Sequence, residues 1–407
     1  MVAAEVSRLL RQDRGQLLAA LIRAVGDFDL AEEALSDAVE AAWVHWARSG
    51  VPRSPKGWLL QVGRRRAIDR LRRGQRFRAR VPELTIMLEE DEAARADDAA
   101  DIPDERLKLI FTCCHPALDR KSQVALTLRT VAGLSTREIA RAFLDTDTAM
   151  GQQLSRAKTK IGAAGIPYAV PDRTEWHPRL QSVLTVIYLI FNEGWTAGAG
   201  DAPIRDTLCC EAIFLARLLG QLASEEPEIE ALLALMLLSW GRRSARHRPG
   251  AGLVGLDEQD RRLWNRDVLE EGLSVLDAAV ARGAPGPFQC QAAIQALHVQ
   301  ADGPEATDWQ QIVLLYDRLL RFQPTDVVRL NRAVALAETG ALALASAEIK
   351  SLAVALEDYQ PYHAARAEVF RQIGDAKGAA LALERAIELS QSEDERRWLE
   401  ARRRALF

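Results

Sequence analysis

Cysteine is scarce in this sequence of 407 residues. Its five cysteines include two adjacent pairs, Cys113 with Cys114 and Cys209 with Cys210. The spacing of a CxxC zinc site and the cysteine density of a disulfide-stabilised secreted domain are both missing. We therefore expect reduced thiols that pack as small hydrophobic side chains. A metal or redox site completed by His115 is the less favoured alternative, because no second cluster of ligands is evident.

Long apolar runs are also missing, although 48% of the residues are hydrophobic and 27% are charged, as in globular proteins. No run reaches the roughly 18 residues that a membrane-spanning helix needs. Charged residues interrupt the apolar stretches at the N-terminus, which excludes the continuous apolar core of a signal peptide. These residues are Glu5, Arg8, Arg11, Asp13 and Arg14. We expect a cytoplasmic protein that has no contact with a membrane.

Signatures of catalysis are absent as well. The sequence has no evident nucleophile-base pair, glycine-rich phosphate loop or HExxH motif. Two polar and aromatic groups in the C-terminal half are interpreted as domain interfaces rather than as an enzyme site: Asp257, Glu258, Asp260, Arg261 and Arg262 near Trp264, and Asn192 with Glu193 before Trp195. We expect a protein that is not an enzyme and that needs no cofactor and no metal.

The net charge of −4 is unevenly distributed. Residues 1–165 carry 27 basic and 23 acidic side chains, about +4, which leaves about −8 for residues 166–407. Between Arg53 and Arg80 eleven Lys or Arg accompany the single acid Asp69, a density that favours contact with phosphates. From Glu83 to Glu105 ten acids accompany one base, which predicts a linker between two small domains.

Apolar residues recur with the 3.6-residue period of helices, and alternating strand patterns are nearly absent. The sequence therefore predicts an all-α fold. We expect a helical domain at 1–80, the acidic linker at 81–104, a second helical domain at 105–165, a helical extension at 170–290 and repeats at 291–407.

The C-terminal part repeats itself at an offset of 34 residues. The pairs are Arg332 with Arg366, Ala333 with Ala367, Gly340 with Gly374, Ala345 with Ala379, Leu336 with Phe370, Ile349 with Leu383 and Leu352 with Ala386. This period, with small residues where helices cross and a glycine at the turn, resembles the tetratricopeptide repeat. A further helix is expected at Trp309 to Phe322 and a closing helix at Arg396 to Leu406. An ordinary bundle of helical hairpins is the alternative.

Two helices of the first domain carry opposite charge. Asp27 to Val39 predicts an amphipathic helix with acids on its exposed face. Pro55 to Arg73 predicts a helix with an apolar stripe and a dense basic rim, which suits a phosphate backbone.

The second domain carries a helix-turn-helix pattern. Ser135 with Glu138 forms a capping box ahead of Ile139 and Ala140, and a second helix follows from Thr146 to Lys160. Polar and basic side chains of this second helix are able to reach base edges and phosphates in the major groove.

In this order, the two patterns resemble regions 2 and 4 of extracytoplasmic-function sigma factors, over Leu17 to Arg73 and Asp104 to Ile161. The C-terminal part resembles the sigma group with a tetratricopeptide-like extension, through Phe191 to Trp195, Leu232 to Leu238, Asp257 to Arg261, Gln291 to Ala296 and Leu330 to Ala335. The resemblance implies an alternative sigma factor, a specificity subunit that binds core RNA polymerase and directs transcription from particular promoters.

The resemblance also implies which residues bind. The β′ clamp helices of the polymerase would meet Asp29, Glu32, Glu33 and Asp37. The −10 element would meet the loop from Ala47 to Pro55 and Trp58, Arg64, Arg65, Arg66, Asp69, Arg72 and Arg73. The −35 element would meet Ser135, Thr136, Arg137, Thr148, Gln152, Gln153, Ser155, Arg156 and Lys158, and the β flap of the polymerase is a further expected partner.

The helix-turn-helix departs from the usual family residues in the turn from Leu144 to Asp147 and in the segment Ala149 to Gly151. The −35 sequence that family members recognise therefore cannot be carried over to this protein.

The extension, residues 170–407, is expected to regulate activity through contact with the first two domains or the polymerase. The alternatives are a conventional repressor or activator, which would bind duplex promoter without polymerase, and a tetratricopeptide scaffold, which would lack salt-dependent affinity for DNA.

Overall fold

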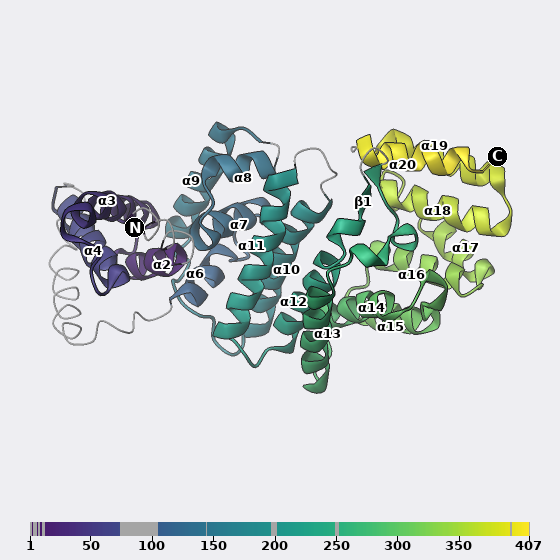
Figure 1. The fold of residues 1–407 in the computed structure, drawn as a ribbon, viewed down its shortest axis with the longest axis horizontal. Coiled ribbons are helices and arrows are strands. Elements are labelled where there is room, and N and C mark those ends of the chain that lie inside the picture. The colour runs from purple at the N-terminus through teal and green to yellow at the C-terminus, as the bar shows by residue number, and fades with distance from the viewer. Residues whose placement is uncertain are drawn as a thin grey trace. The chain divides into compact units, whose positions relative to one another are not determined.

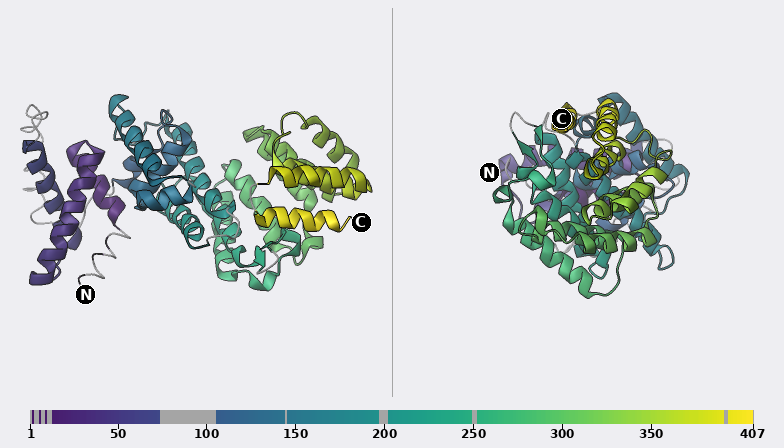
Figure 2. Two further views of the ribbon diagram at one scale, coloured as in Figure 1. Left: turned by 90° about the horizontal axis from the view of Figure 1, so that it is seen from above. Right: turned by 90° about the vertical axis from the view of Figure 1, so that its right-hand side faces the viewer.

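The computed structural model describes residues 13–73, 105–143, 145–196, 202–248, 252–390 and 393–406, with Val2, Val6 and Leu9. The expected acidic linker at 81–104 lies outside the described residues, as does Leu144 of the expected turn. Within the described residues the elements are helical (Figures 1 and 2), apart from the antiparallel pair β1 (His247–Arg248) and β2 (Gly252–Leu253). The prediction of an all-α fold is confirmed.

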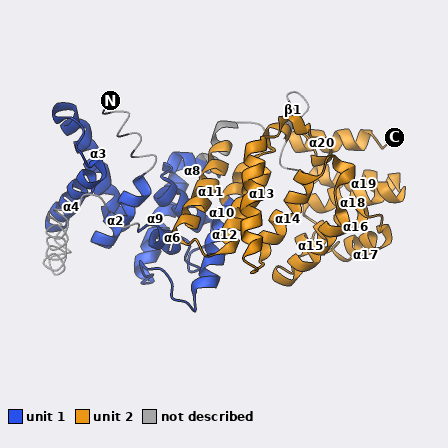
Figure 3. Ribbon diagram, turned by 60° about the horizontal axis from the view of Figure 1, so that its bottom comes forward, with its two compact units in different colours: residues 1–189 blue, residues 190–407 orange. Residues whose placement is uncertain are grey.

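The chain forms two compact units, Met1–Leu189 and Ile190–Phe407 (Figure 3). The boundary falls inside one helix, α10 (Trp176–Thr196). No helix among the described residues is long and apolar enough to cross a membrane. The finer domain bounds expected from the sequence stay predictions.

The first unit begins with the bundle of α2 (Arg14–Val25), α3 (Phe28–Ser49) and α4 (Pro55–Arg73), called here the α2–α4 bundle. Its core is made of leucines and alanines that recur every three or four residues, which places them on one helix face. The fully buried ones include Leu17, Leu21, Ala31, Ala34, Ala38, Leu59 and Ala67. Gly26 ends α2 with a φ of 70°, and Asp27 begins α3 by accepting a hydrogen bond from the Leu30 N–H.

The second bundle of this unit, called the α6–α9 bundle, runs from α6 (Arg106–Cys113) and α7 (Arg120–Thr127) to α8 (Thr136–Ala142) and α9 (Asp147–Ala163). A π-helical turn, η2 (Leu128–Ala132), continues α7. The start of α10 packs on α6, because the Arg179 guanidinium donates to the Phe111 carbonyl at 2.9 Å and Trp176 contacts the Phe111 ring. The first turns of α10 therefore belong to the first unit.

The second unit contains longer helices followed by hairpins. Its elements are α11 (Ala202–Leu222), α12 (Pro227–Trp240), α13 (Arg266–Ala281), α14 (Pro287–Gln300), α15 (Trp309–Phe322), α16 (Asp326–Glu338), α17 (Leu342–Ser351), α18 (Gln360–Ile373), α19 (Ala376–Leu389) and α20 (Glu393–Arg404). Single-turn helices, η3 (Arg243–Ala245), η4 (Leu256–Glu258), η5 (Arg261–Leu263) and η6 (Pro304–Ala306), connect some of them. The helices expected at Trp309 to Phe322 and near Arg396 to Leu406 are both present.

The 34-residue offset of the sequence appears as two helical hairpins. α16 and α18 begin 34 residues apart, as do α17 and α19. Gly340 and Gly374 lie at the two turns with φ of 82° and 89°. The small residues Ala333 and Ala367 are buried where the helices meet. The repeat predicted for this segment is thus a repeat of structure, while its relation to the tetratricopeptide family stays a prediction.

Candidate functional site

The acidic face of α3 is divided between two sets of partners. Arg70 of α4 lies 2.7 Å from both Glu33 Oε2 and Asp37 Oδ2. Glu33 is 57% exposed and Asp37 is 29% exposed. Glu32 is only 13% exposed and faces a different part of the unit. Of the four acids predicted to bind polymerase, Glu33 and Asp29 present the most open carboxylates.

The basic rim of α4 is largely open to solvent. Arg65, Arg66 and Arg72 are exposed, as is Asp69, whereas Arg64 is half-buried. The side chain of Arg73 lies outside the described residues. Gly63 allows the close packing behind this rim, since a Cβ there would lie 3.2 Å from the Leu21 side chain. The apolar face of α4 therefore packs inside the bundle. Its opposite face exposes arginines that are able to bind an anion.

A groove of about 660 Å³ runs between α3 and α4. It is lined by Asp37, Glu40, Ala41, Val44, His45, Arg48, Arg66 and Arg70. Three arginines outnumber the two carboxylates, so the groove favours a negatively charged or polar occupant. Trp58, predicted to contact the −10 element, is half-buried beside this groove, where its ring contacts His45 and Trp46.

The helix-turn-helix expected at Gly133 to Lys160 is formed by α8 and α9. The Ser135 hydroxyl accepts from the Glu138 N–H at 3.2 Å, and a Glu138 carboxylate oxygen accepts from the Ser135 N–H at 2.7 Å. This reciprocal pair confirms the capping box. Thr146 begins α9 by accepting from the Ala149 N–H at 3.1 Å.

The residues predicted to bind the −35 element do not share one environment. Those exposed to solvent are Ser135, Arg137, Thr148, Gln152, Ser155 and Arg156, and Thr136 is half-buried. Gln153 is half-buried and its amide lies 3.4 Å from the Ser122 hydroxyl. Lys158 has a side chain only 10% exposed. The exposed set fits the expected DNA surface, while Gln153 and Lys158 contact other parts of the protein.

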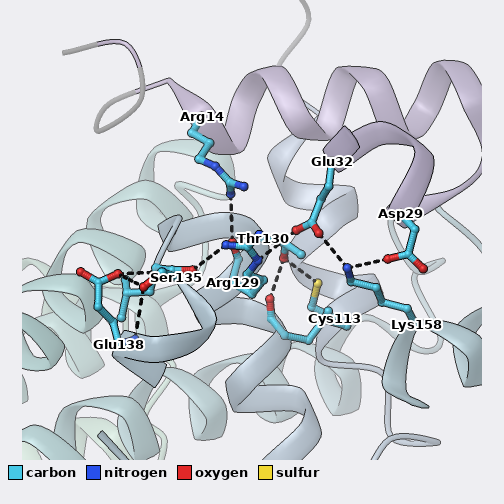
Figure 4. Close-up of polar contacts among 11 residues, drawn as sticks. Arg14, Asp29, Glu32, Cys113, Arg129, Thr130, Ser135, Glu138 and Lys158 are labelled. Atoms are coloured by element: carbon cyan, nitrogen blue, oxygen red, sulfur yellow. Dashed lines mark hydrogen bonds and ion pairs between the residues drawn. The ribbon is translucent and has the colours of Figure 1, made fainter. Parts of the chain in front are cut away.

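Lys158 joins the two bundles (Figure 4). Its ammonium lies 2.8 Å from Asp29 Oδ1 and 2.8 Å from Glu32 Oε2. The Arg129 guanidinium of η2 approaches the other Glu32 oxygen at 3.2 Å. Burial works to lower the pKa of Lys158, but the two carboxylates outweigh it and the pKa is raised. The lysine is therefore held in its charged form between α3 and α9.

The adjacent cysteines of the first unit are buried, as expected from the sequence. Cys113 Sγ lies 3.2 Å from the Thr130 hydroxyl, and Cys114 Sγ lies 3.5 Å from the Thr127 hydroxyl. Burial raises the pKa of the Cys113 thiol, and it raises that of Cys114 to about 12. Both thiols stay protonated at neutral pH, which makes them poor metal ligands and nucleophiles.

Sequence reasoning missed Arg14, Gly15 and Arg129. The Arg14 guanidinium donates to the Arg129 carbonyl at 3.1 Å, which ties α2 to η2. A Cβ on Gly15 would lie 2.7 Å from the Val131 carbonyl oxygen. Gly15 lies in the first turn of the leucine-rich helix α2, and a glycine in a helix is an unfavourable choice unless another backbone approaches closely. That signal at Gly15 was present in the sequence and pointed to a contact.

Comparison with known proteins agrees with this organisation. The family model described as Sigma-70 region 2 matches residues 9–77, and the model described as Sigma-70, region 4 matches residues 108–161. A family of unknown function, DUF6596, matches residues 179–280. The chain is 45% identical over 385 residues to the uncharacterized protein R00370 of Rhizobium meliloti (strain 1021), covering 94% of this chain and 91% of that protein.

A region 2 bundle followed by a region 4 helix-turn-helix defines a sigma factor, a non-catalytic subunit of RNA polymerase that acts in promoter-specific transcription initiation. The chain belongs to the sigma-70 family and carries a C-terminal extension, in which the DUF6596 match lies.

Proposed function

We propose that this sigma factor binds core polymerase through the acidic face of α3, the −10 element through α4 and the −35 element through α8 and α9. The observation that carries the proposal is the separation of charge in the first unit. Acids gather on α3, and exposed arginines line α4 (Arg65, Arg66 and Arg72) and α9 (Arg156). Arginines of this kind neutralise phosphates, while the open polar residues Thr148 and Gln152 are placed to read base edges.

A sigma factor opens a promoter without making or breaking any covalent bond itself. The α6–α9 bundle would position the polymerase on duplex DNA through phosphates and base edges. The α2–α4 bundle would then exchange base stacking at the −10 element for contacts with protein, at a cost of roughly a few kcal/mol per unstacked base. Since polymerase and chromosome share the cytoplasm, we place the protein there.

The test is co-elution of the purified full chain with bacterial core polymerase. The variant Glu33→Lys, Asp37→Lys should lose binding, because it reverses the exposed charge that would meet the clamp helices. A matched control is Glu270→Lys, Asp277→Lys, which makes the same change in net charge on exposed positions of α13. Equal binding by both variants would remove the acidic face from the proposal.

The double variant also removes the ion pairs of Arg70 with Glu33 and Asp37. The effect of releasing Arg70 must therefore be measured by itself. The variant Arg70→Gln keeps the acids and releases their internal partner. We expect it to bind polymerase at least as well as the wild type, since exposed ion pairs contribute only about 0–1 kcal/mol to stability. Failure of Arg70→Gln to bind would assign the interface to the arginine instead.

We also propose that the extension regulates the sigma factor. Its repeated hairpins resemble arrays that present concave surfaces to other proteins. Within the second unit a cavity of about 490 Å³ is lined by charged and aromatic side chains, among them Arg261, Trp309, Glu368 and Arg402. Cavities of about 300–1,000 Å³ are the usual size for ligand sites. A chain ending after Thr196 should change the rate or the regulation of transcription in vitro, and unchanged initiation would contradict this role.

A further inference from the structure

The last helix of the second unit returns to a segment far earlier in the chain. α20 packs against α19 (Figure 1) and against β2, which belongs to the connection between α12 and α13. The Arg402 guanidinium of α20 lies 3.4 Å from Asp257 and 3.7 Å from Glu258 of η4. Residues 145 positions apart are thus in contact, and both segments line the cavity of about 490 Å³.

The acids that line this cavity already have partners. Glu368 lies 2.5 Å from the Arg371 guanidinium, and Asp257 is the partner of Arg402. Glu338 accepts a hydrogen bond at 2.8 Å from a side-chain amide of α18. Two of the three lining arginines are therefore neutralised within the cavity wall.

The third lining arginine, Arg261 of η5, has no such partner. Among the described residues its guanidinium pairs with no carboxylate and donates to the Ala301 carbonyl. The neighbouring Arg242, only 6% exposed, donates to the Leu238 carbonyl at 3.0 Å and to a side-chain amide of α14, and it too pairs with no carboxylate of the described residues. The two guanidiniums lie 4.7 and 6.0 Å from the centre of the Trp264 ring.

These arginines make the region beside the cavity positive. Burial, followed by Arg246 and Arg261, lowers the pKa of Arg242 to about 10. Burial, followed by Arg242 and Arg261, lowers the pKa of the lining His298 to about 4, so this imidazole is neutral at neutral pH. Burying a charge is costly unless an opposite charge is close. An anion in the cavity would therefore be stabilised by charges that the fold has left without a counterpart.

The cavity also contains a hydrogen-bond donor that the fold leaves unused. Trp398 of α20 lines the cavity, and its indole N–H is buried with no acceptor among the described residues. Buried indole N–H groups usually have a hydrogen-bond partner. The Arg402 guanidinium lies 4.2 Å from the centre of the same ring, which fixes the position of the indole. The donor is thus held in place for an acceptor oxygen.

Much of the remaining wall is apolar. It includes the Trp309 ring, which meets the His298 ring edge-to-face at 5.2 Å, and small and branched side chains of four segments. These side chains are Ala364, Ala367, Leu383, Leu399 and Leu406. A mainly apolar wall with a few convergent polar groups is typical of sites for small organic molecules.

We propose that this cavity binds a small organic acid with an aromatic body. The Arg261 guanidinium holds the carboxylate, because its planar fork matches the two oxygens of that group. The Trp398 N–H donates to a ligand oxygen, and the aromatic body lies against the apolar wall. Binding of the acid is independent of sigma activity, whereas its effect on transcription rests on the regulatory role proposed for the extension.

The first test is isothermal titration calorimetry of the full chain with phenylacetate, cinnamate and naphthoate. Each acid is compared with its neutral primary amide, which has nearly the same shape. At least one acid should bind, about tenfold more tightly than its amide, because hydrogen bonds to a charged group are the stronger ones. Absence of binding by all three acids, or equal binding by acids and amides, would overturn the proposal.

Substitution of Arg261 tests which cation holds the carboxylate. Arg261→Gln should reduce the affinity for the acid to that for the amide, and Arg261→Lys should retain an intermediate affinity, because lysine keeps the charge without the planar fork. The matched control is Arg262→Gln, since Arg262 is the next residue, has an 89% exposed side chain and pairs with Asp260 at 2.8 Å. This control should bind as the wild type does. Equal losses in Arg261→Gln and Arg262→Gln would exclude Arg261 as the carboxylate-binding residue.

Trp398→Phe keeps an aromatic ring on α20 and removes only the indole N–H. Its affinity for the acid should fall severalfold, and unchanged affinity would contradict the role of this donor. The folding of every variant is checked by circular dichroism. If Arg261→Gln does not fold, Trp398→Phe and the comparison of acid with amide in the wild type still decide the proposal.

Hydrogen exchange locates the bound acid within the chain. The acid should slow exchange in α14, α18 and α20, which supply lining residues of the cavity, and leave the α2–α4 bundle unchanged. Protection confined to the first unit would refute the placement in this cavity.

Initiation in vitro with core polymerase separates the site from its regulatory effect. Saturating acid should change the rate of initiation with the wild type and not with Arg261→Gln. An unchanged rate with the wild type, while calorimetry detects binding, would contradict regulation through this cavity but not the binding site. A lack of initiation with and without the acid would instead contradict the proposed function of the chain as a sigma factor.

Discussion

The indole of Trp58 stacks on the imidazole of His45, with ring centroids 5.5 Å apart and planes inclined by 15°. The edge of the same indole meets Trp46, whose ring is 5.3 Å away and almost fully buried. Aromatic pairs at these separations stabilise a fold by about 0.5–1.5 kcal/mol beyond the area they bury. Trp58 therefore anchors α4 to α3, in addition to the DNA contact proposed for it.

The two roles of Trp58 are separable by substitution. Trp58→Ala should reduce the free energy of unfolding by about 2–3 kcal/mol, below the range for fully buried tryptophans because this one is half-buried. Trp58→Phe keeps a ring against His45 and should cost less. Urea unfolding measures both effects.

Binding of the same variants to single-stranded −10 DNA tests the second role, at a temperature where all are folded. A loss of affinity in Trp58→Ala that Trp58→Phe largely restores indicates stacking of a base on the ring. Full affinity in Trp58→Ala would reduce the residue to a packing role.

The helix α9 offers a matched pair for DNA binding. Arg156 is exposed, whereas Gln153 is half-buried with its amide 3.4 Å from the Ser122 hydroxyl. Arg156→Ala should weaken binding to duplex −35 DNA and lower the slope of log affinity against log salt by about 1, if the guanidinium neutralises one phosphate. Gln153→Ala should leave the salt slope unchanged. Similar salt slopes for the wild type and Arg156→Ala would exclude Arg156 from phosphate contact.

Local features of the first unit were accessible from sequence, whereas its long-range contacts were not. The capping box of Ser135 and Glu138 involves residues three positions apart, so the pattern itself contains the geometry. Lys158 meets Glu32 across 126 residues, and no local pattern encodes that pairing. Its position was still informative, since Lys158 follows the buried Leu154 by one helical turn and thus borders the apolar face of α9.

In the second unit, too, local features were predictable from the sequence and long-range contacts were not. The 34-residue offset predicted a repeated unit, because small residues and a turn glycine recur, and α16 to α19 repeat at that offset. The surroundings of His298 were not predictable, since Trp309 lies on the next helix and Arg242 and Arg261 lie much earlier in the chain. Burial and charge at one point of a helical array depend on how distant helices stack.

Gly340 and Gly374 should be intolerant of any side chain for a backbone reason alone. Both have positive φ, 82° and 89°, and a Cβ at either would meet nothing within 4 Å. Alanine in the left-handed region costs about 1–2 kcal/mol. Gly340→Ala and Gly374→Ala should each lower the stability of the second unit by that amount in thermal unfolding.

The control for these two substitutions is Gly162→Ala. It also introduces a Cβ into open space, but Gly162 is not among the glycines with positive φ. This variant should keep or slightly raise stability, because alanine is the better helix former. Equal destabilisation by all three would refute the backbone argument.

His298 should make the second unit sensitive to acid. Burial, followed by the nearby charges of Arg242 and Arg261, lowers the pKa of its imidazole from 6.5 to about 4. The unfolded chain therefore binds a proton between these two values that the folded chain does not. The stabilisation is complete above about pH 6.5 and is lost as the pH falls toward 4, by no more than about 3 kcal/mol for this one group.

Hydrogen exchange of α14 and α15 between pH 7 and pH 4.5, corrected for the intrinsic rate, measures this loss directly. In the wild type the free energy of opening should decrease as the pH falls. In His298→Gln the decrease should be smaller, because glutamine does not take up the proton. His177→Gln, which removes an exposed histidine of α10, should behave as the wild type. The same decrease in His298→Gln as in the wild type would assign the acid sensitivity to carboxylates, whose protonation would then dominate the stability of these helices.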